Sequence, residues 1–397
     1  MDAAAILRTA LPVAAPAINL ASGSTPPIDP QLLMTTDDIC RSNGYRCEVH
    51  PVSTEDGYEL TMHRILPSAP FRAAILVMSG LIGCSDNFFA FGKNNSLPFM
   101  LADAGYDVFL GNQRGCAYSR GHKKWTRRDP QYWRYTLDDV ALFDMPALVS
   151  LAQRLSGERR LFYVGYSAGT HSLYAFLQLR PDLRPSLRAA FLLGPAVLFT
   201  RHHNPLIRAL ASFPDRTLRE MGKNAGELMG RTRSFVQLVW QTCRDDAPPL
   251  LKRGCRSFSK MFFGLTANKT KGVNEPFTMA HSFCGTSTMA SAHYIQMMKS
   301  RKLEGFDWGP KENFRRYGSE KPPEYQLQNI TLPIASFVGR NDRYVSLEDA
   351  QLLSRKSSRN LGVFVMPPGG WDHFDYVANT QAPRLIYDRI LGMMAGL

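Results

Sequence analysis

The chain has 397 residues, 44% of them hydrophobic and 11% aromatic, and this composition supplies a sizeable core and excludes an intrinsically disordered protein. No apolar run reaches the roughly 18 consecutive residues that a spanning helix needs, so nothing after the first residues is expected to cross a bilayer. The formal net charge of +13 favours anionic partners such as phospholipid head groups, nucleic acid or acidic substrates, unless it reflects only a basic solvated surface.

Residues 1–36 are predicted to be a leader. Its apolar stretch, Ala10–Ile18, and the small residues Ala21–Ser24 form a signal-peptide pattern. The pattern is weak, because Asp2 and a single Arg8 precede the stretch and two prolines lie within it. Seven cysteines leave one unpaired if the others all bridge, so their number does not decide the redox compartment. The pattern favours secretory targeting, with the cytoplasm or a lipid-droplet surface as the alternative.

After the leader, short apolar runs alternate with longer amphipathic stretches, which is typical of parallel strands joined by crossover helices. Their nearly continuous hydrophobicity indicates strands that are buried on both faces. The predicted strands are Ala73–Met78, Asp107–Leu110, Leu161–Val164, Ala189–Leu193, Ile334–Val338 and Gly362–Met366. The predicted fold class is α/β, with a mostly parallel central sheet flanked by helices.

The alternation stops between Phe199 and about residue 320, where basic and aromatic segments show no clear strand. We interpret residues 200–320 as an inserted helical cap, or lid. This insertion divides the predicted core domain into residues 37–199 and 321–397.

The strongest chemical signal is the sequence from Gly165 to Gly169, which reads G-x-S-x-G around Ser167. It directly follows a predicted strand and directly precedes a helical run from Thr170 to Leu179. In this setting the pattern places the serine hydroxyl above the sheet, beside a helix N-terminus. Ser167 is therefore predicted to be a nucleophile, although the two glycines would also suit a tight packing of helix on strand.

An acid and a histidine follow at the ends of later strands. Asp342 follows the fifth predicted strand and His373 follows the sixth, so with Ser167 they give the chain order of α/β-hydrolases. The imidazole would take the serine proton during attack, and an ionised carboxylate would hold the correct imidazole tautomer. Asp372 and Asp375 are alternatives for the acid, but residues this near in sequence seldom reach back to the histidine ring.

Two backbone amides are predicted to form an oxyanion hole. The amide of Ala168 follows the nucleophile, and that of Leu81 lies in the loop after the first predicted strand, where Gly80 lets the backbone approach a substrate. Ser79 or Cys84 in that loop could instead be the nucleophile, but neither lies between a strand and a helix.

At this point the chain resembles the acid lipase family, which contains gastric lipase and lysosomal acid lipase. The similar segments follow one order over residues 37–395: Gly44-Tyr45, Val52–Leu60, Asn94–Val108, Leu110–Gly115, Gly165–Gly169, Gly285–Thr288, Phe306–Gly309, Gly339–Asp342, Asp372–Asp375 and Ala382-Pro383. The resemblance implies the α/β-hydrolase fold and hydrolysis of lipid esters, either triacylglycerols or sterol esters, through a serine acyl-enzyme without a metal or organic cofactor. It also implies a secreted or lysosomal location.

By position, the resemblance assigns the nucleophile, acid and base to Ser167, Asp342 and His373, and the oxyanion donors to Leu81 and Ala168. It further implies a cap disulfide between Cys243 and Cys255, which would stabilise the cap by about 2 to 4 kcal/mol in an oxidising compartment.

Two motifs depart from the family pattern, the oxyanion loop and the turn around Ser167. Ser79 stands where the family has a histidine, and Tyr166 and Ala168 stand on either side of Ser167 where the family has histidine and glutamine. Backbone donors survive these changes, so we expect them to alter substrate preference and the rigidity of the oxyanion loop.

The cap supplies a candidate lipid contact. Phe235, Leu238, Val239 and Trp240 would share one side of a helix, which would bury apolar side chains in a lipid surface, or would simply pack on the core. A basic segment, residues 120–128, also contains Trp125, but no nucleic-acid-binding motif accompanies it, so we interpret it as a solvated loop and expect no nucleic-acid partner.

The function that these observations favour is a lipase with peripheral contact to a lipid interface. One alternative is an esterase or acyltransferase that uses smaller acyl esters, since the triad chemistry is shared. A second, of a different class, is a catalytically silent lipid-binding protein. The sequence leaves chain-length preference, pH optimum and oligomeric state open.

Overall fold

The computed structural model describes residues 27–93, 95–201, 205–264, 274–367 and 370–397. The signal-peptide pattern in residues 1–24 lies outside the described residues. No helix within the described ranges is long and apolar enough to cross a membrane.

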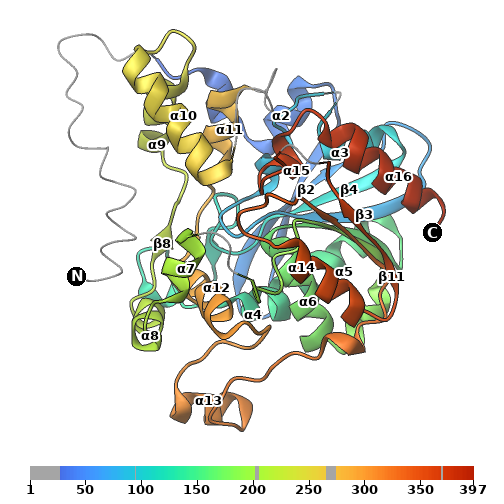
Figure 1. Cartoon of the computed structure of the whole chain (residues 1–397). Coiled ribbons are helices and arrows are strands. Elements are labelled where there is room, and N and C mark those ends of the chain that lie inside the picture. Colours follow the sequence, from blue (N-terminus) through green and yellow to red (C-terminus); the bar gives the residue numbers. More distant parts are fainter. Residues whose placement is uncertain (1–26, 94, 202–204, 265–273, 368–369) are drawn as a thin grey trace.

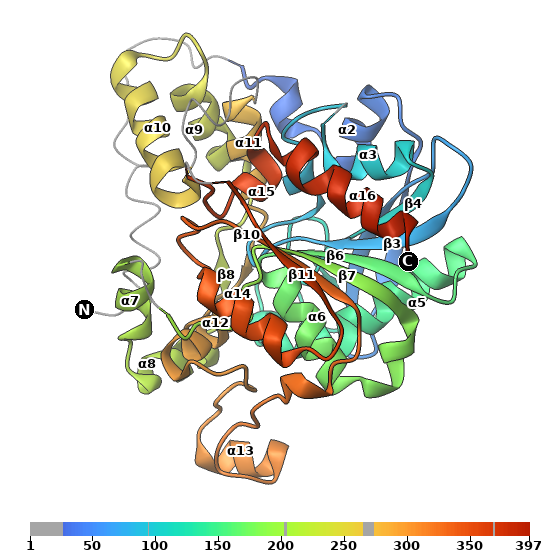
Figure 2. The same ribbon diagram turned by 45° about the vertical axis from the view of Figure 1, so that its right-hand side comes forward.

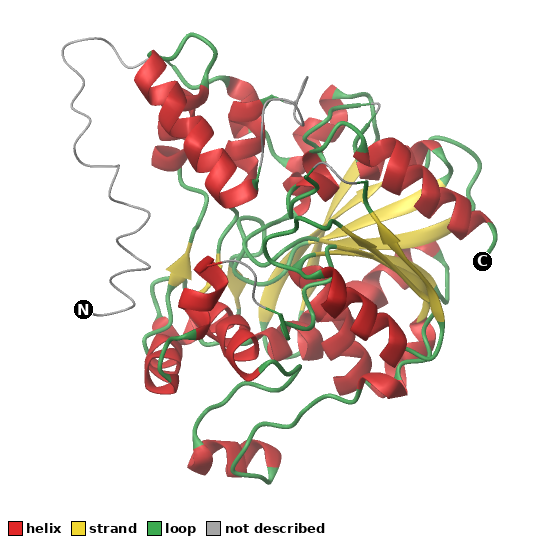
Figure 3. Ribbon diagram, in the orientation of Figure 1, coloured by secondary structure: helices red, strands yellow, loops and turns green. Residues whose placement is uncertain are grey.

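A nine-stranded sheet forms the centre of the molecule (Figure 3). Its order is β1-β2-β4-β3-β6-β7-β10-β11, with β5 paired to β2. Pairing is parallel from β4 to β11, whereas β2 runs antiparallel to its neighbours. The strands are β1 (Cys47–Ser53), β2 (Tyr58–Ile65), β3 (Ala73–Met78), β4 (Tyr106–Gly111), β5 (Gly121–His122), β6 (Leu161–Tyr166), β7 (Leu187–Leu193), β10 (Ile334–Val338) and β11 (Asn360–Val365).

Helices cover both faces of this sheet (Figure 1). Strands such as β3, β4 and β6 are therefore buried along their whole length. One face packs against α4 (Leu137–Asp139), α5 (Met145–Ser156), α6 (Ala168–Leu179) and α14 (Leu347–Lys356). The other packs against α2 (Thr36–Ser42), α3 (Leu97–Asp103), α15 (Asp375–Ala378) and α16 (Asp388–Ala395).

Short 3₁₀ and π-helical turns connect these elements. They are η1 (Pro30–Leu33), η2 (Ser85–Phe88), η3 (Pro130–Trp133), η4 (Val140–Asp144), η5 (Pro181–Ser186), η6 (Leu327–Asn329) and η7 (Pro383–Tyr387).

The segment predicted to be a cap is mostly helical, and its helices gather beside one end of the sheet except for α13, which lies apart from the others (Figure 2). They are α7 (Pro205–Ala211), α8 (Asp215–Lys223), α9 (Arg233–Cys243), α10 (Pro249–Phe263), α11 (Glu275–Ser282), α12 (Thr288–Ser300) and α13 (Pro310–Tyr317). Two groups are visible, α7 with α8 and α12, and α9 with α10 and α11. Contrary to expectation, the segment also contains a small antiparallel pair, β8 (Glu227–Leu228) with β9 (Thr286–Ser287).

All six predicted strands are present, and their observed ends differ from the predicted ones by no more than two residues. The mostly parallel α/β sheet is therefore confirmed. Sequence reasoning missed β1 and β2, because residues of these antiparallel strands are partly exposed and do not form continuous apolar runs.

The packed part of the chain begins before residue 36. Leu32 in η1 is fully buried, and its carbonyl accepts a hydrogen bond from Arg231 at 2.6 Å. The last residues of the predicted leader thus belong to the folded structure.

Candidate active site

Ser167 lies on a sharp turn between β6 and α6, with a φ of 53° that non-glycine residues rarely adopt. The flanking glycines permit this turn. A Cβ atom at Gly169 would stand 2.6 Å from the carbonyl oxygen of Met78, and one at Gly165 would stand 2.9 Å from the backbone of Gly169. Only glycine fits these two positions, so the G-x-S-x-G pattern is a steric requirement of the turn.

The structure brings Ser167, His373 and Asp342 into one hydrogen-bonded chain. The Oγ atom of Ser167 lies 2.7 Å from Nε2 of His373. On the other side of the ring, Nδ1 lies 3.0 and 2.9 Å from the two carboxylate oxygens of Asp342. This geometry suits an imidazole that accepts the serine proton while its Nδ1–H donates to a carboxylate.

The carboxylate of Asp342 is completely buried, and both of its oxygens accept hydrogen bonds from groups besides the His373 ring. Its Oδ1 accepts the backbone N–H groups of Tyr344 at 2.9 Å and Val345 at 3.0 Å. Its Oδ2 accepts the hydroxyl of Tyr376 at 3.0 Å. Burial, with the neighbouring Asp342 charge adding to it, raises the pKa of Tyr376 well above its usual value, so this phenol stays a proton donor. Three donors besides the imidazole thus hold the Asp342 carboxylate in place.

Asp372 and Asp375 have other partners. Asp372 forms an ion pair with Arg343 and accepts the backbone N–H of His373 at 2.8 Å. Asp375 accepts the backbone N–H of Asp372 at 2.5 Å. The Nδ1 atom of the His373 ring lies within hydrogen-bonding distance of both carboxylate oxygens of Asp342, so the geometry favours Asp342 as its partner.

Tyr166, which stands where the family has a histidine, contacts His373. Its hydroxyl donates to the backbone carbonyl of His373 at 3.0 Å, and the two rings lie 5.4 Å apart. Burial raises the pKa of Tyr166 well above its usual value, which keeps the hydroxyl proton available.

Both candidate oxyanion donors belong to segments next to Ser167: Ala168 follows it directly, and a Cβ at Gly80, the residue before Leu81, would stand 3.2 Å from the serine Cβ. Within the described residues, neither the N–H of Ala168 nor that of Leu81 donates to a protein acceptor. Ala168 begins α6, where a backbone N–H has no partner inside the helix. The carbonyl of Gly80 accepts the N–H of Gly83 at 3.1 Å, so the N–H of Leu81, on the opposite side of the same planar peptide, points away from that turn.

Ser79 and Cys84, the alternative nucleophiles, are placed differently from Ser167. Both are buried, and Cys84 is joined to Cys284 in a disulfide. Cys84, Asp86 and Cys284 form a cluster of three potential metal ligands. Because the two sulfur atoms are bonded to each other, they offer no thiolate to a metal ion.

The predicted lid residues mostly face the protein. Val239 is buried, and Phe235, Leu238 and Trp240 are half-buried. Phe235 stacks edge-on against Phe283, with ring centroids 5.3 Å apart. The apolar side of α9 therefore packs on its neighbours, as the plain packing alternative expected. The cap disulfide implied by the family resemblance is present, since Cys243 at the end of α9 is joined to Cys255 in α10.

Helix α10 is the outer helix of this group, and its C-terminal end lies against the candidate catalytic residues. Arg343, directly after the triad acid, donates to the carbonyl of Met261. The hydroxyl of Tyr344 donates to the carbonyl of Phe262 at 3.2 Å. The ring of Phe263 lies 4.3 Å from that of Phe374, the residue after His373.

Sequence reasoning missed several residues of this site. Tyr376 donates a hydrogen bond to the triad acid. Gly194 leaves room for this contact, because a Cβ there would stand 2.7 Å from the Tyr376 ring and 3.3 Å from Oδ2 of Asp342. The position of Tyr376 three residues after His373 was the available signal for it, because residues that close share one loop.

The basic segment of residues 120–128 has a partner within the molecule. Arg120 forms an ion pair with Glu227 at 2.8 Å, so part of the segment's charge is neutralised.

Comparison with known proteins gives a consistent result. Residues 73–379 match the family profile described as alpha/beta hydrolase fold, and residues 36–92 match a partial alpha/beta-hydrolase lipase region. Lipase member M of Homo sapiens is 30% identical over 95% of this chain and 89% of its own length. Gastric triacylglycerol lipase of Rattus norvegicus is 29% identical over 94% of each chain.

Lysosomal acid lipase/cholesteryl ester hydrolase of Homo sapiens is also 29% identical, over 94% of this chain and 93% of its own. Among solved structures, a candidate lipase from Sulfolobus solfataricus superposes with a TM-score of 0.59 at 12% identity, covering 88% of this chain and 94% of that one. The structural likeness concerns the fold alone.

Proposed function

Since this chain belongs to the lipase family of the α/β-hydrolase fold and is a carboxylic ester hydrolase, we propose that Ser167 is its nucleophile, His373 its general base and Asp342 the triad acid. The observation that carries the proposal is the continuous hydrogen-bonded chain from Ser167 Oγ through the imidazole to the carboxylate.

In the first half of the reaction Ser167 attacks the ester carbonyl while Nε2 of His373 takes the hydroxyl proton. Asp342 stabilises the resulting imidazolium without taking a proton itself. The imidazolium then returns the proton to the leaving alcohol, which leaves an acyl group on Ser167. In the second half water attacks the acyl-enzyme, with His373 again as base.

The amides of Leu81 and Ala168 stabilise the negative charge that develops on the carbonyl oxygen in both halves. Both N–H groups lack a protein acceptor within the described residues, so they are available to an oxyanion. Removing one such donor typically lowers kcat by about 10² to 10³.

The proposed substrates are long-chain lipid esters, either triacylglycerols or sterol esters. The relatives whose names specify substrates support this assignment. The test is hydrolysis of emulsified long-chain triacylglycerol and of cholesteryl ester beside a soluble butyrate ester. Activity only on butyrate, or acyl transfer to an alcohol in preference to water, would favour the esterase or acyltransferase. A wild-type protein that neither hydrolyses any ester nor reacts with a fluorophosphonate would favour the silent lipid-binding protein.

The outward face of α10 is the proposed lipid contact, in place of the side chains of α9. Leu250 and Met261 on this helix are 79% and 60% exposed, which is unusual for apolar side chains. Arg253, Arg256 and Lys260 are also exposed on it. The sequence contains no acidic residue between Ala247 and Asn274, so this face is complementary to an anionic lipid surface.

Vesicle binding tests this surface. Replacing Arg253, Arg256 and Lys260 by glutamine should weaken binding to vesicles containing anionic phospholipid by about 100-fold, since each basic residue near such a surface contributes roughly 1 kcal/mol. Replacing Lys123, Lys124 and Arg128 by glutamine removes the same charge elsewhere and is the matched control. Equal weakening by both triple variants would show a general charge effect and contradict a specific role of α10.

A secreted or lysosomal location is proposed from the two disulfides, which persist in oxidising compartments, and from the gastric and lysosomal relatives. Mass spectrometry of the alkylated, unreduced protein from producing cells tests it. Four alkylated thiols at Cys84, Cys243, Cys255 and Cys284 would indicate a reducing compartment instead.

A further inference from the structure

The loop that carries the candidate oxyanion donor Leu81 is held from two sides. On the core side, the side-chain amide of Gln113 donates to the carbonyl of Leu81 at 2.8 Å. On the cap side, the backbone N–H of Cys284 donates to the carbonyl of Ile82 at 2.7 Å. Two successive peptides of the loop are therefore fixed by side chain and backbone groups from distant parts of the sequence.

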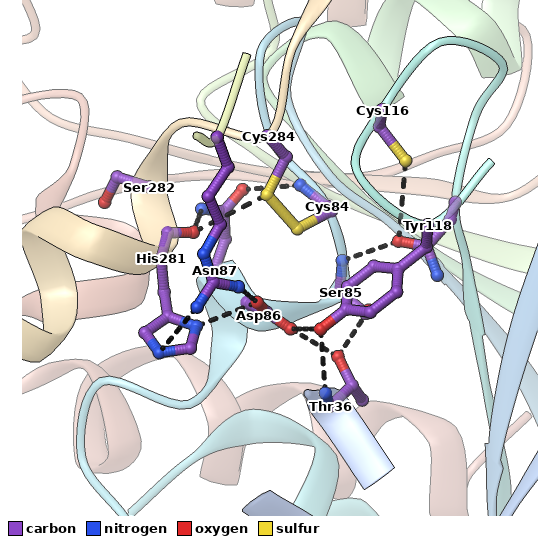
Figure 4. The surroundings of a disulfide bond; sticks show 12 residues. Thr36, Cys84, Ser85, Asp86, Asn87, Cys116, Tyr118, His281, Ser282 and Cys284 are labelled. Atoms are coloured by element: carbon purple, nitrogen blue, oxygen red, sulfur yellow. Dashed lines mark hydrogen bonds and ion pairs between the residues drawn. A yellow bond between two sulfur atoms is a disulfide. The ribbon is translucent and has the colours of Figure 1, made fainter. Parts of the chain in front are cut away.

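A covalent bond lies directly beside these hydrogen bonds (Figure 4). Cys84, three residues after Leu81, is joined to Cys284 across a sequence separation of 200 residues. Asn87 bridges the same junction, because its Oδ1 accepts the N–H of Cys84 at 3.1 Å and its amide donates to the carbonyl of His281 at 3.1 Å. The bond thus ties the oxyanion loop to the segment that follows α11.

A buried charge cluster completes the junction. Asp86, 1% exposed, lies 2.8 Å from Nδ1 of His281 and 2.8 Å from the guanidinium of Arg231. It also accepts hydrogen bonds from Tyr118 at 2.7 Å and from Thr36 at 2.5 Å. Because the Asp86 carboxylate has partners from both the cap and the core, it fixes the position of the cap residues Arg231 and His281 relative to the core.

We propose that residues 281–284 form a positioning clamp for the oxyanion hole, with the Cys84–Cys284 disulfide as its covalent part. The clamp keeps the Gly80–Leu81 peptide beside Ser167, where a Cβ at Gly80 would stand 3.2 Å from the serine Cβ. A segment of the cap is then part of the reaction geometry. This inference rests on the proposed ester hydrolysis.

The clamp is tested with the variant Cys84→Ala/Cys284→Ala and a soluble butyrate ester, which does not depend on a lipid interface. We expect kcat to fall by about 10- to 100-fold with KM within about twofold, because a displaced oxyanion donor affects the transition state more than the bound ester. Affinity for a trifluoromethyl ketone, whose adduct with Ser167 carries the oxyanion, should fall in parallel.

Cys116→Ala is the matched control. Its sulfur packs against the same disulfide but is not bonded to it, so this variant should lose stability and keep its kcat within about twofold. An unchanged kcat in the double variant, or an equal loss of kcat in the control, would overturn the clamp.

Asn87→Ala provides a second measurement that leaves the disulfide intact, should the double variant not fold. It removes both bridging hydrogen bonds, and we expect kcat to fall about three- to tenfold at constant KM; an unchanged kcat would again contradict the proposal. A wild-type protein that hydrolyses no ester would contradict the proposed function instead, so the two failures are distinguishable.

Discussion

The hydroxyl of Tyr166 donates to the backbone carbonyl of His373, 3.0 Å away, so the residue before the nucleophile fixes the main chain of the candidate base. The family that this chain resembles has a histidine at this position, whose side chain differs in length and in donor geometry. The tyrosine therefore gives this protein a direct link between the β6 turn and the loop that carries the imidazole.

Tyr166→Phe should lower kcat by about three- to tenfold and the free energy of unfolding by about 1 to 3 kcal/mol, because a buried carbonyl loses its donor. Steady-state kinetics on a soluble ester and chemical denaturation measure the two effects. A variant with wild-type kcat would show that the His373 backbone is held by its other contacts.

Ser167→Ala should leave at most the residual catalysis of the oxyanion hole and of substrate binding, roughly 10³ to 10⁴ over water, while the protein remains folded. Labelling by a fluorophosphonate should disappear as well. Retained labelling in this variant would require another nucleophile.

Asp342→Asn should lower kcat by about 10⁴, because the neutral amide no longer selects the correct His373 tautomer. Asp372→Asn is the comparison, since Asp372 pairs with Arg343 and contacts only the backbone of His373; we expect a loss of less than about tenfold. If Asp372→Asn proved the more damaging change, the triad acid would have to be reassigned.

The Asp86 cluster predicts how stability depends on pH. Burial opposes ionisation of Asp86, but the charges of His281 and Arg231 outweigh it and lower the pKa to about 2, from 3.8 in the unfolded chain. A lowered folded pKa adds stability above the unfolded value and loses it as the pH falls through the folded one. The group thus contributes about 2 kcal/mol that disappears between pH 4 and 2. Urea denaturation of wild type and Asp86→Asn from pH 2.5 to 6 measures it, and the difference between them should shrink towards low pH. A constant difference would contradict the lowered pKa.

The half-buried side chains of α9 should serve folding more than lipid contact. Phe235→Ser/Trp240→Ser should therefore lower stability by several kcal/mol through lost apolar burial. Activity should fall on long-chain and butyrate esters to a similar degree, in contrast to changes on α10. Selective loss on emulsified lipid with unchanged stability would restore α9 as the lipid contact.

The sequence by itself predicted the parallel strands and Ser167, because these depend on local patterns. Buried parallel strands are continuous apolar runs, and the turn at Ser167 admits only glycine at two fixed positions. The order of Asp342 and His373 followed from the ends of predicted strands. The antiparallel strands β1 and β2 were not predicted, because their partly exposed positions carry polar residues that interrupt the apolar runs.

The tertiary structure alone decided which groups meet across long sequence distances. Nothing local in the sequence joins Cys84 to Cys284 or Tyr166 to His373, since each contact depends on how the cap and the last loop fold over the sheet. The tertiary structure also decides which cap side chains are exposed. Helices α9 and α10 both carry apolar residues at helical spacing, and only packing determines that α9 faces inward while Leu250 and Met261 of α10 remain exposed. Periodicity defines an apolar side of a helix, but the neighbouring elements determine whether that side meets protein or solvent.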